Sequence, residues 1–267
     1  MASLTRSSSA AALALAVLMT ARAVPATAQT PSPQYTLDVN LLHQNLSDSK
    51  PVQQEFTVQL TKKIGALDTV FGAIDQHNRF DELDTEVTIG ASHTYVRQRM
   101  RLTGSYTEGL GAEQASEHAF EIKVGQALAK HFEPEVKYEF KYYDPDIITN
   151  VITLGGLVPV KGSFSIAGGY QHSYGPSGDD GDAVSVTVNV NASRAVGLTF
   201  GSGFGDEHVL ARTQTEVLRF DKKAFTLQGG FSWSIDARRT LGVSYEFQDR
   251  IDLYRINGLT VDWSQSF

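Results

Sequence analysis

The sequence predicts an all-β protein: a closed antiparallel transmembrane β-barrel of about 14 strands, preceded by a cleaved signal peptide. Three observations support this fold class. Apolar and polar residues alternate with a period of two over most of the 267 residues. The alternating segments are about ten residues long, as a tilted membrane-crossing strand requires. The polar phase carries charges of both signs, which suit the wet interior of a barrel.

Composition excludes several classes of protein. The chain has 23 Lys and Arg against 30 Asp and Glu, and a formal net charge of −7 argues against a nucleic-acid partner. Because there is no cysteine, disulfide frameworks, Cys-ligated zinc, iron–sulfur clusters and thiol catalysis are excluded. No run of 18 apolar residues follows the N-terminus, so a helical membrane protein is excluded too. We expect no cofactor.

The N-terminus has the three parts of a secretory signal. Arg6 supplies the positive region, residues 10–19 form a ten-residue apolar core, and Ala26-Thr27-Ala28 fits a cleavage site before Gln29. The expected organisation is therefore a signal peptide at 1–28, a short leader at 29–34 and the barrel at 35–267. This organisation places the protein in the bacterial outer membrane of a Gram-negative envelope.

Alternation by itself also fits a soluble β-sandwich or propeller. In 184–191, valines occupy every second position and Ser, Thr and Asn fill the others. In 135–142, Glu and Lys alternate with Val, Tyr and Phe. Charges on one face of long strands favour the barrel, because a wet lumen can hold them while the apolar phase faces lipid.

Fourteen strands are expected, and an even number lets both ends of the barrel lie on the periplasmic side. Twelve or sixteen strands are the alternatives, because the long loop at 206–221 has room for strand extensions. The segment near 75–80 is ambiguous in phase, since Phe71 and Ala73 compete with Val70 and Ile74 for the lipid-facing positions. The expected strands are 35–46, 54–63, 68–80, 84–95, 98–108, 116–128, 134–143, 147–160, 162–174, 182–193, 195–205, 222–235, 239–249 and 254–267.

Aromatic residues cluster at the ends of these strands, where amphipathic rings form the girdles of membrane proteins. The alternative is that they are ordinary strand aromatics. The candidate interfacial residues are Tyr106, Tyr142, Tyr170 and Tyr174 at one rim, and Tyr95, Trp233, Trp263 and the terminal Phe267 at the other.

The inward phase carries a nearly balanced set of charges. A ring of one sign would select ions, whereas this mixture either pairs across the lumen and closes it or lines a water-filled path. The candidate lumen-lining residues are Arg99, Arg101, Glu121, Lys123, Glu135, Lys137, Glu139, Lys141, Glu246 and Asp262.

The sequence gives little support for an enzyme, a calcium site or a phosphate-binding loop. His118 and His172 fall in the apolar phase near the surface rim, and the neighbouring Ser173 points to the opposite face, so a hydrolase is not expected. The Asp-rich stretch 177–182 could bind calcium, but a solvated hairpin loop explains it as well. The glycines of 201–205 keep strand phase, which argues against a phosphate-binding loop. No catalytic residue, metal ligand or cofactor-binding residue is assigned.

Three segments resemble the YaiO-type outer-membrane β-barrel family: VFGAIDQHNRFDELDTEVTIGASHTY at 70–95, GSGFGDE at 201–207 and YEFQDRIDLYRINGLTVDWSQSF at 245–267. The resemblance runs from about residue 40 to the end and rests on the order and spacing of strands. It implies an outer-membrane barrel without an established enzymatic activity, sometimes associated with exopolysaccharide export. One departure is Gln265, where such tails carry an aromatic or bulky apolar residue, so we expect the assembly machinery to recognise the last strand less strongly or in a different way.

These observations lead to three hypotheses. The first is a porin-like passive conduit for small solutes, or a barrel associated with exopolysaccharide export. The second is a closed-lumen structural barrel whose loops 109–115, 174–182 and 206–221 meet a partner. The third is a lipid-modifying outer-membrane enzyme. The expected partners are outer-membrane lipid, the barrel-assembly machinery through the C-terminal strand, and a polysaccharide or small solute.

Overall fold

The structure is a computed structural model in which strands account for nearly all of the described residues. It describes residues 34–47, 52–79, 82–110, 116–128, 132–143, 147–161, 163–175, 180–212, 217–251 and 254–267. The expected signal peptide at 1–28 and most of the leader lie outside these ranges. No helix within them is long and apolar enough to cross a bilayer.

The expected barrel of fourteen antiparallel strands is confirmed. Every strand pairs with its neighbours in the sequence, and β1 pairs with β14 to close the sheet. The strands are β1 (Tyr35–Leu46), β2 (Gln53–Ile64), β3 (Asp68–Arg79), β4 (Glu82–Tyr95), β5 (Met100–Leu110), β6 (His118–Gln126), β7 (Glu133–Tyr143), β8 (Ile147–Lys161), β9 (Phe164–Tyr174), β10 (Asp180–Asn191), β11 (Val196–Arg212), β12 (Val217–Ser234), β13 (Arg239–Arg250) and β14 (Tyr254–Ser266).

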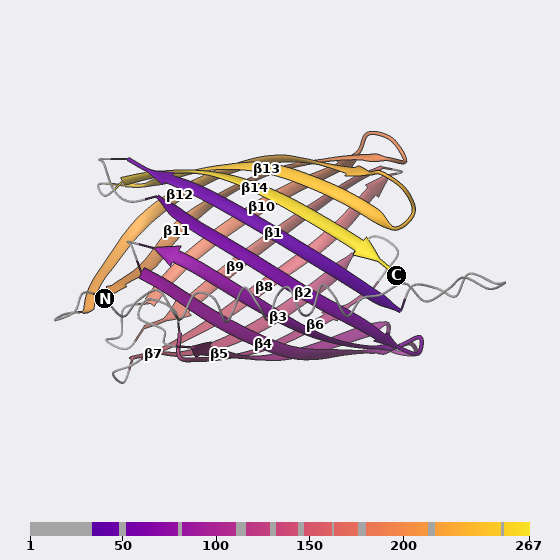
Figure 1. Ribbon diagram of the computed structural model, residues 1–267, viewed down its shortest axis with the longest axis horizontal. Helices are drawn as coiled ribbons and strands as arrows, with labels where there is room; N and C mark the ends of the chain where they lie inside the picture. Colours follow the sequence, from indigo (N-terminus) through magenta and orange to yellow (C-terminus); the bar gives the residue numbers. More distant parts are fainter. Residues whose placement is uncertain are drawn as a thin grey trace, which may run out of the picture.

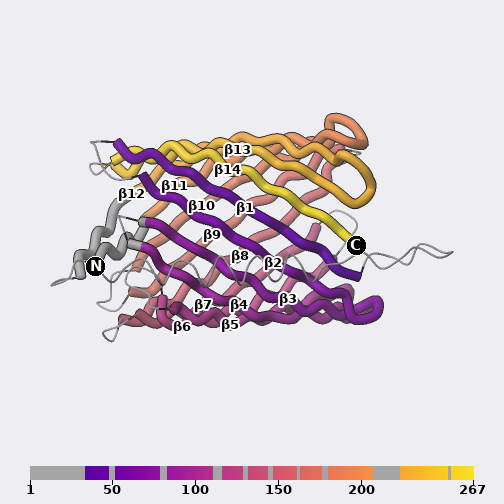
Figure 2. The backbone as a smooth tube through the Cα atoms, viewed as in Figure 1, coloured from indigo at the N-terminus to yellow at the C-terminus, as the bar shows by residue number. Residues whose placement is uncertain are grey.

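The seam between the first and last strands is continuous. Its register runs from Thr36 opposite Ser266 to Leu46 opposite Ile256, and the backbone N–H of Gln34 donates to the carbonyl of Phe267 at 2.9 Å. Figures 1 and 2 show these two strands side by side, indigo beside yellow, with the start of β1 and the end of β14 at the same end. We call this the turn end, and the opposite end the loop end.

The segment expected as a long loop at 206–221 is mostly strand. Strands β11 and β12 stay paired from Asp206 opposite Lys223 to Arg212 opposite Val217, so only 213–216 separates them. The register sets Asp206 opposite Lys223, and opposite charges at facing positions favour the pairing of strands. The polar composition of the segment is typical of a loop, which is why the sequence did not predict this hairpin.

The two phases of each strand face different surroundings. The lipid-facing phase carries large exposed apolar side chains such as Ile89, Phe120, Val184 and Phe231. The inward phase is polar along most strands. Near the seam it includes a small apolar cluster of Leu46, Tyr254 and Ile256 at the loop end.

The ambiguous phase of β3 is resolved by a close contact inside the barrel. Phe71 lies opposite Gly90 of β4, and a Cβ atom added at Gly90 would lie 2.2 Å from Cζ of the Phe71 ring. The aromatic side chain therefore covers the glycine on the inward face, while Val70 and Ile74 take the lipid-facing phase. An aromatic ring that covers a glycine on a neighbouring strand helps to fix strand register.

The turn end is shaped by local hydrogen bonds. The Asp236 carboxylate accepts the backbone N–H groups of Arg238 at 2.8 Å and Arg239 at 2.9 Å, and the Nε–H of Arg239 at 2.7 Å. Gly65 supplies a positive φ of 71° in the β2–β3 turn, which glycine adopts without steric cost.

The first prediction concerns the contact between Phe71 and Gly90. Gly90→Ala should destabilise the barrel by about 1–3 kcal/mol, because the new methyl group overlaps the ring. Gly72→Ala is the matched control, since its Cβ would meet its nearest neighbour, Thr88 O, at 3.7 Å. Urea unfolding of both variants in lipid vesicles checks this, and equal stabilities would contradict the packing described.

The second prediction concerns Asp236. Hydrogen bonds from the Arg239 guanidinium and from the backbone N–H of Arg238 hold the pKa of the Asp236 carboxyl below its ordinary value. A lowered pKa stabilises the turn above the ordinary carboxyl pKa, and this contribution is lost as the pH falls through the lowered value. Titration of the carboxyl carbon by NMR should therefore give a low midpoint that rises in Arg239→Ala. An unchanged midpoint in that variant would contradict the assignment.

Candidate functional site

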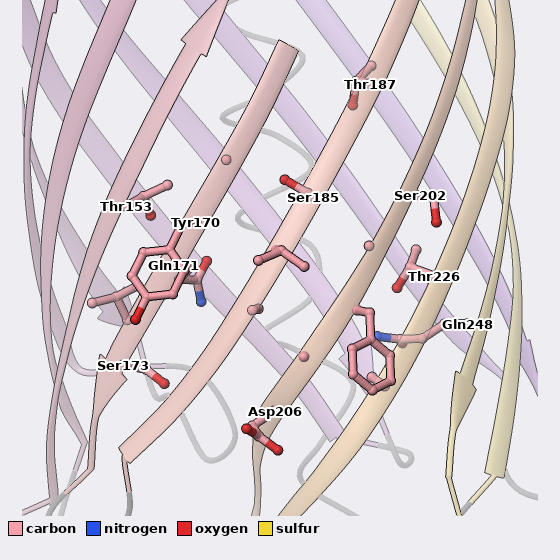
Figure 3. Close-up of a pocket in the computed structure, with 18 of the residues that line it drawn as sticks. Thr153, Tyr170, Gln171, Ser173, Ser185, Thr187, Ser202, Asp206, Thr226 and Gln248 are labelled. Atoms are coloured by element: carbon pink, nitrogen blue, oxygen red, sulfur yellow. The ribbon is translucent and has the colours of Figure 1, made fainter. Parts of the chain in front are cut away.

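The lumen contains a cavity of about 490 Å³ bordered by strands β7 to β13. Its inward-facing side chains are almost all uncharged and small. Figure 3 shows hydroxyl and amide groups from several neighbouring strands around the same space, Ser185 and Thr187 of β10 among them. We call the uncharged inward set the neutral wall: Thr149, Val151, Thr153, Gly169, Gln171, Ser173, Ala183, Ser185, Thr187, Gly203, Gly205, Ala224, Thr226, Gln228 and Gln248.

Few of the described charged residues line this cavity. Among the described residues that line it, Lys141 of β7 and Asp206 of β11 are the ionisable groups other than tyrosine. Because hydroxyl and amide groups both donate and accept hydrogen bonds, the neutral wall can exchange bonds with water or with a hydroxyl-rich solute.

A second part of the lumen is charged but internally balanced. Strands β6 and β7 carry three carboxylates and three lysines in the inward phase. The register places Glu121 opposite Glu139 and Lys123 opposite Lys137, an arrangement of like charges that by itself is unfavourable. We call this set the charge ladder: Glu121, Lys123, Glu135, Lys137, Glu139 and Lys141.

Ion pairs between neighbouring positions relieve the repulsion in the charge ladder. Lys123 Nζ lies 2.9 Å from Glu135 Oε2, and Lys141 Nζ lies 2.8 Å from Glu139 Oε1. Lys137 Nζ is shared between Glu139 at 3.4 Å and Glu121 at 3.6 Å. Two of these pairs join β6 to β7 and two lie along β7 itself, so the charges are neutralised locally on one stretch of wall.

A third part of the lumen lies toward the loop end of β2, β3 and β4. His77 is buried there between two carboxylates, with Nδ1 3.1 Å from Glu55 and Nε2 3.2 Å from Glu86. Thr57 donates to Asp75 at 2.5 Å, and Ser116 donates to Glu86 at 3.2 Å. The sequence prediction missed this cluster because Phe71 and Ala73 on the inward face obscured the phase of β3.

The structure brings together only part of the predicted lumen set. The six charge-ladder residues form one network, as described. Arg101 faces inward and donates to Ser92 Oγ at 3.2 Å, and Asp262 accepts a hydrogen bond from Asn40 across the seam at 2.5 Å. Glu246 faces inward on β13, opposite Gln228 and Gly258. Arg99 lies in the β4–β5 turn with φ of 49°, and not on a strand of the wall.

The predicted interfacial aromatics all lie near the strand ends. Tyr106, Tyr142, Tyr170 and Tyr174 are on the lipid-facing phase near the loop end, while Tyr95, Trp233 and Trp263 are near the turn end. Phe267 follows β14 directly at the turn end. Tyr143 of β7 is on the inward phase and lines the lumen cavity, whose lining also includes Tyr170 and Tyr174.

No site for a metal ion is evident in the described part of the chain, where no group of three or more His, Asp and Glu residues is placed to hold one. Asp179 of the Asp-rich stretch lies outside the described residues, and Asp180 and Asp182 belong to β10. Ser173 donates to the carbonyl of Gly181 at 3.2 Å on the inward face, away from the lipid-facing His172.

Comparison with known proteins supports the architecture. No family model matches, and no curated protein matches, so the resemblance to the YaiO-type family stays a prediction. Solved structures do match over most of the chain. A bacterial polysaccharide outer membrane secretin is 8% identical with a TM-score of 0.65, covering 89% of this chain and 100% of its own.

Two further structures match similarly. The CymD monoaromatic hydrocarbon channel is 8% identical with a TM-score of 0.58, covering 90% of each chain. The Acinetobacter baumannii outer membrane protein Omp33 is 11% identical with a TM-score of 0.54, covering 89% of this chain and 100% of its own. At such low identities the likeness shows the fold, which is that of outer-membrane β-barrels including channels.

A third prediction tests the charge ladder. Glu139→Gln removes the carboxylate shared by Lys137 and Lys141 and leaves an excess positive charge on the lumen wall. A unit charge about 4–8 Å from a permeating ion in water changes the local ion concentration about two- to fivefold, so permeability should shift toward anions by that factor.

Reversal potentials in a KCl gradient across planar bilayers measure this shift. Glu108→Gln is the matched control, because Glu108 is on the lipid-facing phase of β5. If both variants give the wild-type reversal potential, the charge ladder does not line a conducting path.

Proposed function

We propose that the protein is a passive, water-filled conduit of the bacterial outer membrane for uncharged polar solutes, with saccharides as the solute class it fits best. The single observation that carries this proposal is the neutral wall, which borders a cavity of about 490 Å³ with hydroxyl, amide and glycine positions from six adjacent strands.

The chemistry of the neutral wall suits transient contact with sugars. Hydroxyl and amide groups exchange hydrogen bonds with sugar hydroxyls at little net cost, because they do the same with water. Conduction requires binding that is favourable enough for entry and weak enough for release. A wall of many small, similar groups meets this requirement, whereas a few strong charges would hold a solute in place.

The charge ladder supports an open path. Its lysines and carboxylates are neutralised by neighbours at 2.8–3.6 Å on the same stretch of wall. A fourteen-stranded barrel has a diameter that leaves space in the lumen beyond its own side chains, because diameter grows with strand number. An exported polysaccharide is one saccharide solute that this path would accommodate in extended form, which is how the proposal includes exopolysaccharide export.

The orientation follows from the closed topology. With an even number of strands, both ends of the sheet lie at the turn end, and in single-chain bacterial barrels this end faces the periplasm. The loop end then faces the outside. The proposal requires no catalytic residue and no cofactor.

The fourth prediction tests the conduit. Vesicles that contain the folded protein should swell in an uncharged trisaccharide, and planar bilayers should show channel events. Ser185→Arg and Thr226→Arg should each reduce the swelling rate severalfold, because a long cationic side chain fills the cavity and disrupts the neutral wall. Val186→Leu on the lipid-facing phase of β10 is the control and should swell like the wild type.

Each outcome decides between the hypotheses. If the protein is folded but gives no channel events and no swelling, the lumen is closed and the barrel is structural. If the Arg variants swell at the wild-type rate, solutes do not pass the neutral wall.

A further inference from the structure

A repeated hydrogen-bond geometry occurs on the lipid-facing surface near the loop end. A tyrosine on each of β5, β7, β9 and β13 lies four or five residues before the loop-end terminus of its strand. Its hydroxyl donates a hydrogen bond to an acceptor that lies two residues closer to the loop end, on the same strand or on the adjacent one. The four tyrosines, which we call the tyrosine belt, are Tyr106, Tyr138, Tyr170 and Tyr245, and their acceptors are Glu108, Asn150, Asp182 and Asn257.

The distances in this belt are short and consistent. Tyr138 Oη donates to Asn150 at 2.7 Å and Tyr245 Oη donates to Asn257 at 2.6 Å. Three acceptors face the residue two positions beyond the tyrosine, since Asn150 is opposite Phe140, Asn257 is opposite Phe247 and Asp182 is opposite His172. Glu108 is itself the residue two positions beyond Tyr106 on β5. Because this kind of hydrogen bond recurs on separate hairpins, the polar acceptors lie at a similar depth on the outer surface near the loop end.

Two of the acceptors are carboxylates that also pair with histidine. His172 Nδ1 lies 2.7 Å from Asp182 Oδ1, and His118 Nδ1 lies 3.0 Å from Glu108 Oε2. These groups are accessible: the exposed fraction of the side chain is 60% for Asp182 and 44% for Glu108.

Aromatic faces flank both histidines. The His118 ring stacks between Tyr106 and Tyr142, with centroids 6.2 and 6.0 Å away. The rings of His172 and Tyr174 are nearly perpendicular, at 82°, with their centroids 4.3 Å apart. Each cluster therefore presents an acidic acceptor beside exposed aromatic rings.

The belt fixes the depth of the membrane boundary. Below it, the lipid-facing positions of β5 are Gly104 and Leu102, and those of β13 are Val243 and Leu241. A carboxylate at hydrocarbon depth is strongly unfavourable, so Asp182 and Glu108 must lie in the headgroup layer while the tyrosine rings lie at the interface.

We propose that these two clusters bind the saccharide headgroup of a glycolipid in the outer leaflet. Carboxylates accept hydrogen bonds from sugar hydroxyls, and aromatic faces pack against the apolar faces of sugar rings. A lipid phosphate fits less well, because it would meet Asp182 and Glu108 with like charge. The inference does not depend on conduction through the lumen, since the residues of both clusters are on the lipid-facing phase of their strands.

The experiment is native mass spectrometry of the folded barrel in detergent, titrated with a diglucosyl diacylglycerol, which has an uncharged disaccharide headgroup. Phosphatidylglycerol with the same acyl chains is the comparison lipid. The wild type should bind the glycolipid more tightly than the phospholipid. The double variant Glu108→Ala/Asp182→Ala should bind it about tenfold more weakly, as expected when hydrogen bonds to charged acceptors are lost.

Asp249→Ala is the matched control. Asp249 is a lipid-facing carboxylate near the loop end of β13 that pairs with Arg255 at 3.6 Å, and none of the histidines whose side chains are described forms an ion pair with it. It should bind the glycolipid like the wild type. The milder pair Glu108→Gln/Asp182→Asn keeps the shape of the clusters and should give an intermediate affinity if the Ala variant folds poorly.

Two results would overturn the proposal. One is glycolipid binding in the double Ala variant equal to that of the wild type. The other is tighter binding of phosphatidylglycerol that disappears when divalent cations are chelated, which would mean that the carboxylates hold a cation for a lipid phosphate.

Discussion

The whole structure depends on the closure of one sheet in a solvent that offers no hydrogen bonds. Hydrocarbon satisfies neither N–H nor C=O groups, so an unpaired strand edge at membrane depth is strongly unfavourable. The register of β1 with β14 from Thr36 to Leu46 removes that edge, and with it the only place where the sheet could begin or end. Once the cylinder is closed, each strand side chain faces either the lipid or the lumen. Successive side chains alternate between these two sides, and the period of two in the sequence follows from this alternation.

Closure also explains how polar groups are divided between the parts of the lumen. Charged side chains occupy the inward phase on β6 and β7, where each has a partner on its own or the adjacent strand. The arc from β8 to β12 carries hydroxyl, amide and glycine positions instead. A uniform mixture would have scattered charges without neighbours, each with a desolvation cost on a half-buried wall. Segregation lets one arc neutralise itself and leaves another free for contact with solute.

The sequence predicted the fold well and the site in part. Strand β1 was predicted with its observed bounds, because alternation there is unbroken and membrane strands have a fixed length. The prediction failed at 206–221, where a polar segment that was expected to be a loop is mostly strand, and it was undecided at β3, where Phe71 is an aromatic residue on the lumen side. An apolar residue therefore indicates the lipid-facing side of a strand only when it does not fill a space next to a small residue on the lumen side. The space above Gly90, which Phe71 fills, is visible only in three dimensions.

The same limit applies to the lumen residues. The charge ladder was predicted from phase alone, because Glu and Lys alternate strictly with Val, Tyr and Phe on β7. The neutral wall was not predicted, since serine, threonine and glycine in a strand give no chemical signal until register brings several strands together. Ser185, Thr187 and Thr226 become parts of one surface only because β10, β11 and β12 are in a particular register. The sequence by itself therefore does not show which residues face each other on neighbouring strands. In a barrel this register decides whether small polar residues are scattered or form a continuous lining.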